Sequence, residues 1–247
     1  METIQGSYQP VLVSLSFIIS VVGSFAALRL AKLIPLHEPD DRLPWIMAAS
    51  FALAGGAIWS MHFIAMLAFD MGMPVSYDIP MTALSLVLAW AVTGIGFYVV
   101  SRGASSPARL GAAGTLMGVG VATMHYTGMA AMRMGAAISY DTTLLVVSVV
   151  IAVVASTAAL WLAFHLEQLW HMVGAAVIMG VAVCGMHYTG MAAASFRHDA
   201  ATVIPQTSAV AAEFLAYSIF LVSLVILVLG IAFGRVETFE EELAVAD

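Results

Sequence analysis

A six-residue motif that contains one histidine and two methionines occurs three times in the chain. Met124–Met129 and Met186–Met191 share the sequence MHYTGM, and Met61–Met66 is a looser copy, MHFIAM. Each copy lies in a long apolar segment, where ionisable residues are costly and usually functional. The repeat therefore predicts a single site built from three histidines, which lie 63 and 62 residues apart at His62, His125 and His187.

A methionine follows each motif histidine by four residues, which places the two side chains on one face of a helix. Imidazole binds several first-row metals, whereas a thioether favours copper, above all Cu(I). Zinc prefers cysteine, histidine and carboxylate ligands. The predicted cofactor is therefore copper, with zinc or haem as weaker alternatives, and the predicted ligands are His62, His125, His187, Met66, Met129 and Met191.

Other side chains of the motif lie beside these predicted ligands. The methionine before each histidine faces about 100° away on a helix. Tyrosine hydroxyls can orient a ligand or a bound gas, although tyrosines near a span end are also typical of the membrane interface. A buried free cysteine is commonly a small hydrophobe. The candidates for this outer set are Met61, Met124, Met186, Tyr126, Tyr188 and Cys184. Close helix packing is expected at the glycines seven residues before each histidine, Gly55, Gly118 and Gly180.

The composition indicates a membrane protein. Of 247 residues, 62% are hydrophobic and 9% are charged, against about 25% charged in soluble proteins. The chain has no basic block that would indicate nucleic-acid binding. We predict an all-α membrane protein with seven transmembrane helices, in which helices 1–2, 3–4 and 5–6 form three parallel two-helix repeats and the seventh stands apart. The predicted spans are residues 10–34, 44–69, 80–100, 109–132, 141–164, 171–195 and 212–234.

The distribution of Lys and Arg predicts the orientation. Connections 1–2, 3–4 and the C-terminus carry Arg29, Lys32, Arg42, Arg102, Arg109 and Arg235, whereas the opposite connections carry only Arg133 and Arg197. The N-terminus is therefore expected outside, the C-terminus in the cytoplasm, and the histidines near the outer face.

A second repeated motif, Ser-Tyr-Asp, supports the repeat. Ser76–Asp78 and Ser139–Asp141 both read Ser-Tyr-Asp, whereas the third copy is expected to have Arg197–Asp199 instead. Helices 1, 3 and 5 show no comparable polar motif. The aspartates at these outer ends are expected to be solvated loop carboxylates.

Together, the intact tetrapeptides at Met124–Thr127 and Met186–Thr189 make the chain similar to the MHYT family of bacterial integral-membrane sensor domains. The first copy, MHFI, departs from that pattern but keeps Met61 and His62. The resemblance implies a multi-pass sensor in the bacterial cytoplasmic membrane that binds copper and through it detects O₂, CO or NO. It also implies a cytoplasmic output module or partner.

The predicted domain arrangement is a seven-helix sensor domain at residues 1–235, followed by a short acidic cytoplasmic tail at 236–247. An output enzyme is not expected in a tail of this length, and the chain itself is predicted not to be an enzyme. Three other functions stay open: an intramembrane zinc hydrolase with three histidine ligands, haem ligation, and a copper carrier or transporter.

Overall fold

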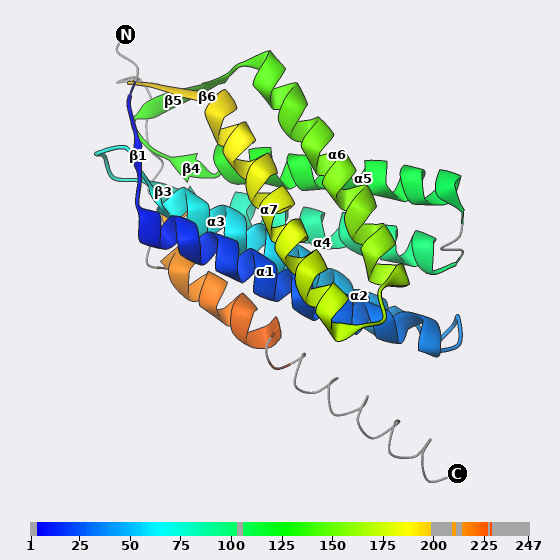
Figure 1. Ribbon diagram of the computed structural model, residues 1–247. Coiled ribbons are helices and arrows are strands. Elements are labelled where there is room, and N and C mark those ends of the chain that lie inside the picture. The colour runs from blue at the N-terminus through cyan, green and yellow to red at the C-terminus, as the bar shows by residue number, and fades with distance from the viewer. Residues whose placement is uncertain (1–3, 103–105, 199–208, 211–213, 227, 229–247) are drawn as a thin grey trace.

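Long helices form the body of the molecule in the computed structural model, which describes residues 4–102, 106–198, 209–210, 214–226 and 228 (Figure 1). The second predicted span is continuous but has three local geometries: α2 (Leu43–Phe51), the π-helical segment η2 (Ala52–Trp59) and α3 (Ser60–Leu67). A short 3₁₀ turn, η1 (Ile34–Leu36), follows the first helix. The other long helices are α1 (Pro10–Leu33), α4 (Ile79–Ser101), α5 (Pro107–Ala130), α6 (Thr142–His165) and α7 (Leu169–Ala193).

Within the described part of the chain, five helices are long and apolar enough to cross a membrane: Pro10–Leu36, Leu43–Leu67, Ile79–Ser101, Thr142–His165 and Leu169–Ala193. The fourth predicted span, α5, has 24 residues, but its glycines, threonines and motif residues make it less apolar. The seventh predicted span is described as a shorter apolar helix, Phe214–Ile226. These helices indicate a membrane protein, and the count of seven spans stays a prediction. Arg235 and the acidic tail, 236–247, lie outside the described residues.

The six long segments alternate around a ring. We call Leu43–Leu67, α5 and α7 the histidine helices, and α1, α4 and α6 the outer helices. Each outer helix packs between two histidine helices: α1 between α7 and η2, α4 between η2 and α5, and α6 between α5 and α7. Leu43–Leu67 is the most buried of the five membrane-length helices described, and Phe214–Ile226 also packs on it through Val222 and Ile226.

Glycines set the distance between neighbouring helices. A Cβ added at Gly118 would lie 2.4 Å from the Cα of Val153 on α6, and one at Gly180 would lie 2.7 Å from a methyl group of Val21 on α1. Close packing is therefore confirmed at these two predicted positions. A Cβ at Gly55 would lie 3.3 Å from Val222, a looser contact. No side chain larger than that of glycine fits at Gly118 or Gly180 without separating the helices.

Short antiparallel strand pairs close one end of the bundle, beside the N-terminus (Figure 1). In each pair, a strand that precedes an outer helix meets the strand that follows the histidine helix of the same repeat. The pairs are β1 (Ser7–Tyr8) with β2 (Phe69–Asp70), β3 (Ser76–Asp78) with β4 (Met132–Arg133), and β5 (Ala136–Tyr140) with β6 (Ala194–His198). A further strand, β7 (Ala209–Val210), joins β3.

Each repeat is also closed by the same backbone hydrogen bond. The N–H groups of Gln9, Asp78 and Asp141 donate to the carbonyls of Ala68, Ala131 and Ala193 at 2.9, 2.8 and 2.8 Å. These donors are the N-cap residues of α1, α4 and α6, and each acceptor lies six residues after a motif histidine. The cap therefore holds all three histidine turns in the same relation to the strands.

The strands correct the predicted position of the third copy of the Ser-Tyr-Asp motif. Its third copy is Ser7–Gln9, which precedes α1 as the other two precede α4 and α6, and not Arg197–Asp199. Asp199 lies outside the described residues. The expectation of a solvated carboxylate was wrong for Asp78, which is 7% exposed. Its carboxylate accepts from the N–H of Met81 at 3.0 Å and pairs with Arg133 at 3.0 Å.

Candidate metal centre

The imidazoles of the three motif histidines meet inside the bundle. The Nδ1 atom of His62 lies 3.0 Å from Nδ1 of His187 and 3.1 Å from Nδ1 of His125. The ring centroids are 4.9 to 5.1 Å apart and the rings are nearly perpendicular. All three residues are at most 1% exposed. Three histidines that are remote in sequence thus form one buried cluster, as the repeat predicted.

The proton count of this cluster favours a bound cation. A neutral imidazole carries one N–H and one lone pair, so a hydrogen bond between two Nδ1 atoms needs a proton on one of them. If His62 supplies it, His125 and His187 carry their protons on Nε2. The Nε2 atoms of the three rings are buried without a partner among the described residues, and this is the same with or without a bound cation. A cation would accept all three Nδ1 lone pairs, whereas one shared proton can satisfy only two of the three Nδ1 atoms.

The spacing of the three nitrogens suits a small metal ion. Metal–nitrogen bonds of about 2.0–2.1 Å place three ligand nitrogens roughly 3.3–3.6 Å from one another. The Nδ1 separations of 3.0 and 3.1 Å from His62 are a few tenths of an ångström shorter than these values, and ligand atoms of all three rings lie within 4.8 Å of one another. The only cluster of metal-ligating His, Cys, Asp or Glu side chains among the described residues is this one. The ligand atoms that fit are therefore the three Nδ1 atoms.

Two motif glycines hold the far edges of the rings. A Cβ added at Gly128 would lie 2.3 Å from Nε2 of His62, and one at Gly190 would lie 2.4 Å from Nε2 of His125. These two imidazoles thus rest on the backbone of the next histidine helix. The matching residue of the first copy is Ala65. The glycine of MHYTG is therefore explained by the ring that it accommodates, and this contact directs Nδ1 towards the cluster.

The other predicted site residues are placed as follows. The three methionines expected as ligands, Met66, Met129 and Met191, are 2%, 0% and 5% exposed, and their role as ligands stays a prediction. The methionines before each histidine, Met61, Met124 and Met186, are also buried. Cys184 is partly exposed and does not belong to the histidine cluster.

The aromatic residue after each histidine joins two repeats. Tyr126 packs edge-on against Tyr140 and Tyr188 against Tyr8, with centroids 5.3 and 5.5 Å apart. The pair of the first copy, Phe63 and Tyr77, has the same geometry at 5.9 Å. Such pairs contribute about 0.5–1.5 kcal/mol beyond their buried area. Burial, with a smaller effect of the partner tyrosine, raises the pKa of Tyr8 and of Tyr140 to about 12, so both hydroxyls stay protonated.

Three serines on the outer helices belong to the site and were missed from the sequence. Tyr126 shares a hydrogen bond with Ser148 at 2.8 Å, and Tyr188 with Ser16 at 3.4 Å. Ser85 lies at the same position of α4, six residues into the helix, where it accepts from the indole N–H of Trp59 at 3.0 Å. The expectation that helices 1, 3 and 5 carry no polar motif was therefore wrong. Their burial and their common position, six residues after each outer-helix start, come from the structure, and the sequence offered only a serine near the start of each of these spans.

The first copy predicts how the tyrosines can be replaced. Because Phe63 stands where the other copies have tyrosine, Tyr126→Phe is expected to keep full metal binding. The variant loses the hydroxyl pair with Ser148, so its free energy of unfolding should fall by about 0.5–1.5 kcal/mol. Metal stoichiometry and denaturant titration of the purified variant measure the two effects. A loss of metal in Tyr126→Phe would mean that the hydroxyl supports the cluster directly.

Comparison with known families places two MHYT repeats, described as "Bacterial signalling protein N terminal repeat", on residues 55–113 and 118–176. Each window begins seven residues before a motif histidine, at Gly55 and Gly118. The third motif, Met186–Met191, lies beyond both matched regions and has the same sequence as the second motif. The strand pairs and interlocking contacts described above extend the same pattern to it.

Several bacterial signalling proteins resemble this chain. It is 45% identical over 195 residues to the bifunctional diguanylate cyclase/cyclic di-GMP phosphodiesterase MucR of Pseudomonas aeruginosa, covering 77% of this chain and 28% of that protein. It is 34% identical over 204 residues to the signaling protein YkoW of Bacillus subtilis, covering 79% of this chain and 25% of that protein. It is 35% identical over 193 residues to the cyclic di-GMP phosphodiesterase NbdA of P. aeruginosa, with 76% and 24% covered.

These relatives are much longer than the region they share with this chain, which spans about a quarter of their length. No solved structure matches the chain. The two matched repeats, the three motif copies and the similarity to MucR, YkoW and NbdA lead to one conclusion. The chain belongs to the MHYT family of bacterial signalling proteins.

Proposed function

We propose that this chain is a membrane-integral sensor domain that binds copper at the histidine cluster and detects a diatomic gas, such as O₂, CO or NO, or the redox or copper status outside the cell. The observation that carries the proposal is the convergence of three buried Nδ1 atoms, at 3.0 and 3.1 Å, on one point among three helices. His62, His125 and His187 would hold the ion, which would supply an open position for a small ligand.

The choice of copper rests on the methionines of the motif. Met66, Met129 and Met191 follow the histidines by four residues, about one helical turn, and are buried. Thioethers are soft ligands that stabilise Cu(I), and imidazole binds copper well in either oxidation state. A mixed nitrogen and sulfur environment of this kind favours copper over zinc.

The alternatives receive less support from the geometry. A zinc hydrolase needs a carboxylate or another base next to the activated water, and the described cluster contains only the three histidines. Haem needs room for a macrocycle between its axial ligands, whereas these ring centroids are 4.9 to 5.1 Å apart. That the chain itself has no catalytic role stays a prediction.

Signal transfer would run through the span that carries His62. The π-helical segment η2 ends three residues before His62, and π-helical turns are common at functional sites. Helix Phe214–Ile226 packs on this segment, with Ile226 against Gly56 and Val222 against Gly55. A shift of His62 would therefore move the contact with this helix, which leads towards the C-terminus.

The proposed orientation places the strand end and the histidine cluster at the outer face of the bacterial cytoplasmic membrane, with the C-terminus inside. The positive-inside rule supports it. Five described basic residues lie at or near helix ends opposite the strands, namely Arg29, Lys32, Arg42, Arg102 and Arg109. Only Arg133 and Arg197 lie in the strands β4 and β6. The partner would be a cytoplasmic output domain or protein. MucR and NbdA carry cyclic di-GMP activities in their names, and an output of that class is part of this proposal.

Metal loading of the full chain tests the proposal. Protein purified without a histidine tag is expected to bind Cu(I) stoichiometrically, and X-ray absorption should find nitrogen and sulfur neighbours. A triple His→Ala variant that binds copper with the wild-type stoichiometry would contradict the proposal. Zinc bound in preference to copper, with nitrogen and oxygen neighbours, would favour the hydrolase. Copper uptake into protein-containing vesicles would favour a transporter.

A further inference from the structure

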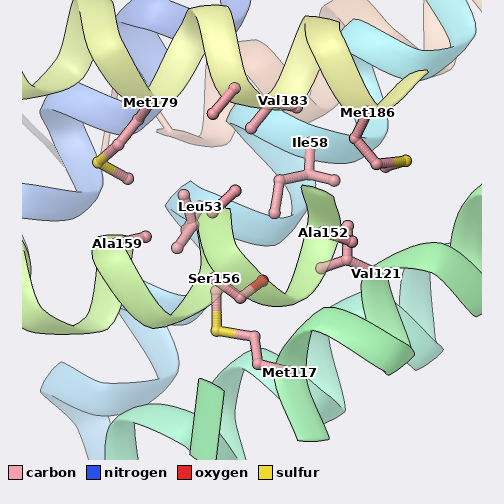
Figure 2. Close-up of a pocket in the computed structure, with 12 residues that line it drawn as sticks. Leu53, Ile58, Met117, Val121, Ala152, Ser156, Ala159, Met179, Val183 and Met186 are labelled. Carbon is pink, nitrogen blue, oxygen red and sulfur yellow. The ribbon is translucent and has the colours of Figure 1, made fainter. Parts of the chain in front are cut away.

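A small cavity lies one helical turn inward from the histidine cluster. Ile58, Val121 and Val183 line it, and each precedes a motif histidine by four residues. Figure 2 shows side chains from η2, α5, α6 and α7 that face one another around this space. Because positions i and i−4 share a helix face, the cavity lies next to the cluster on the side away from the strands.

The cavity is small and almost entirely apolar. Its volume is about 30 Å³, room for about two water-sized spheres. The only polar side chain of its lining is Ser156. A buried water needs two to four polar partners, and apolar cavities without them stay dry and bind gases such as xenon. The shape and chemistry therefore suit a small apolar molecule and not water or a lipid chain.

The cavity exists because one of three equivalent helix junctions is underfilled. In the first repeat, Gly23 lets the helices touch, since a Cβ there would lie 2.4 Å from the backbone N of Ala57. In the second repeat, Val92 fills the space next to Gly120, because a Cβ added at Gly120 would lie 2.4 Å from a methyl group of Val92. The third repeat has alanine at both positions, Ala155 and Ala182, and both line the cavity.

We propose that this cavity is a docking site for a small apolar gas molecule, such as a diatomic, beside the histidine cluster. The ligand class follows from the apolar lining and the volume, independently of which metal the cluster holds. The role of the cavity as a local reservoir for the sensed gas rests on the proposed function. Gas held there would lie one helical turn from the three Nδ1 atoms.

Xenon tests this proposal because it is an inert probe of similar size. In protein labelled with ¹³C at methionine methyls, xenon is expected to shift the resonances of Met117 and Met179 in a saturable manner. Both residues line the cavity and are at most 5% exposed. Met47, which is 40% exposed on α2, reports non-specific partition into the surrounding lipid or detergent. Shifts at Met117 and Met179 no larger than those at Met47 would overturn the proposal.

Two substitutions fill the cavity with residues that the chain already uses at the equivalent positions of α4. Ala155→Val copies Val92, and Ser156→Thr copies Thr93. Each is expected to weaken xenon binding at least about fivefold while copper binding is retained. Val154→Ile is the matched control, because Val154 is 64% exposed on the same helix, and it should bind xenon normally.

The outcomes separate this inference from the metal centre. Xenon is measured on both metal-free and copper-loaded protein. If wild-type protein binds xenon but no copper, the proposed metal centre fails and the cavity assignment stands. If copper binds normally while both filling variants bind xenon as the wild type does, the cavity assignment fails alone.

Discussion

Replacing any one of the three motif histidines by alanine is expected to lower the affinity for Cu(I) by at least about 100-fold. Even residues that only orient a metal ligand commonly cost 10–100-fold when they are removed, and each histidine here would supply one of three converging nitrogens. His62→Ala should lose as much as His125→Ala or His187→Ala, although its motif reads MHFI. The reason is that Nδ1 of His62 contacts both other rings. Competition titration with a Cu(I) chelator measures the three affinities.

His171→Ala provides the matched control, because His171 lies on the same helix as His187 but is exposed at its other end. This variant should bind copper as the wild type does. If His62→Ala kept wild-type affinity while the other two lost theirs, the site would be a two-histidine centre, and the three-ring geometry would not describe the bound state.

The second large effect is expected at the motif glycines. Gly128→Ala and Gly190→Ala would each place a methyl group within the contact distance of an imidazole Nε2, at 2.3 and 2.4 Å. An imidazole is rigid, so a ring displaced at Nε2 also moves at Nδ1. We expect a loss of copper affinity of about 10–100-fold, with a cost of overpacking of about 1–3 kcal/mol in the free energy of unfolding. Copper titration and denaturant unfolding measure the two quantities.

The same helices supply controls for these variants. Gly111 on α5 and Gly185 on α7 have open space where a Cβ would stand. Gly111→Ala and Gly185→Ala should bind copper normally and gain up to about 1 kcal/mol of stability, because alanine favours helix more than glycine does. If all four variants bound copper equally well, the motif glycine would serve helix packing alone.

Much of the fold could be predicted from the length of the apolar segments and the spacing of the repeated motif. The first six predicted spans agree with the helices to within a few residues, since a long apolar segment in a membrane has helix as its favoured backbone state. The position of the prolines helped, because α1, α4 and α5 each have Pro in their first two positions. The π-helical geometry of Ala52–Trp59 was not predicted, because it depends on packing around the span and not on the span's own hydropathy.

Errors in the prediction arose where polar residues act across repeats. The Ser-Tyr-Asp motif was assigned to the end of a histidine helix, whereas its strands precede the outer helices. The related copy at Ser7–Gln9 was therefore overlooked. The buried serines Ser16, Ser85 and Ser148 went unrecognised because single hydroxyls are common in apolar helices. Only the fold shows that each lies at the same turn of an outer helix and is hydrogen-bonded to a side chain of a histidine helix.

The sequence by itself determined the three-fold repeat and the identity of the histidines, because the period of about 63 residues and the imidazoles in apolar segments are visible in one dimension. Tertiary structure alone decided which ring atom faces the centre. It also explained the motif glycine and located the cavity, because all three depend on contacts between residues of different helices. A repeat predicts that equivalent side chains share a depth, but the few tenths of an ångström that define a metal centre come from packing.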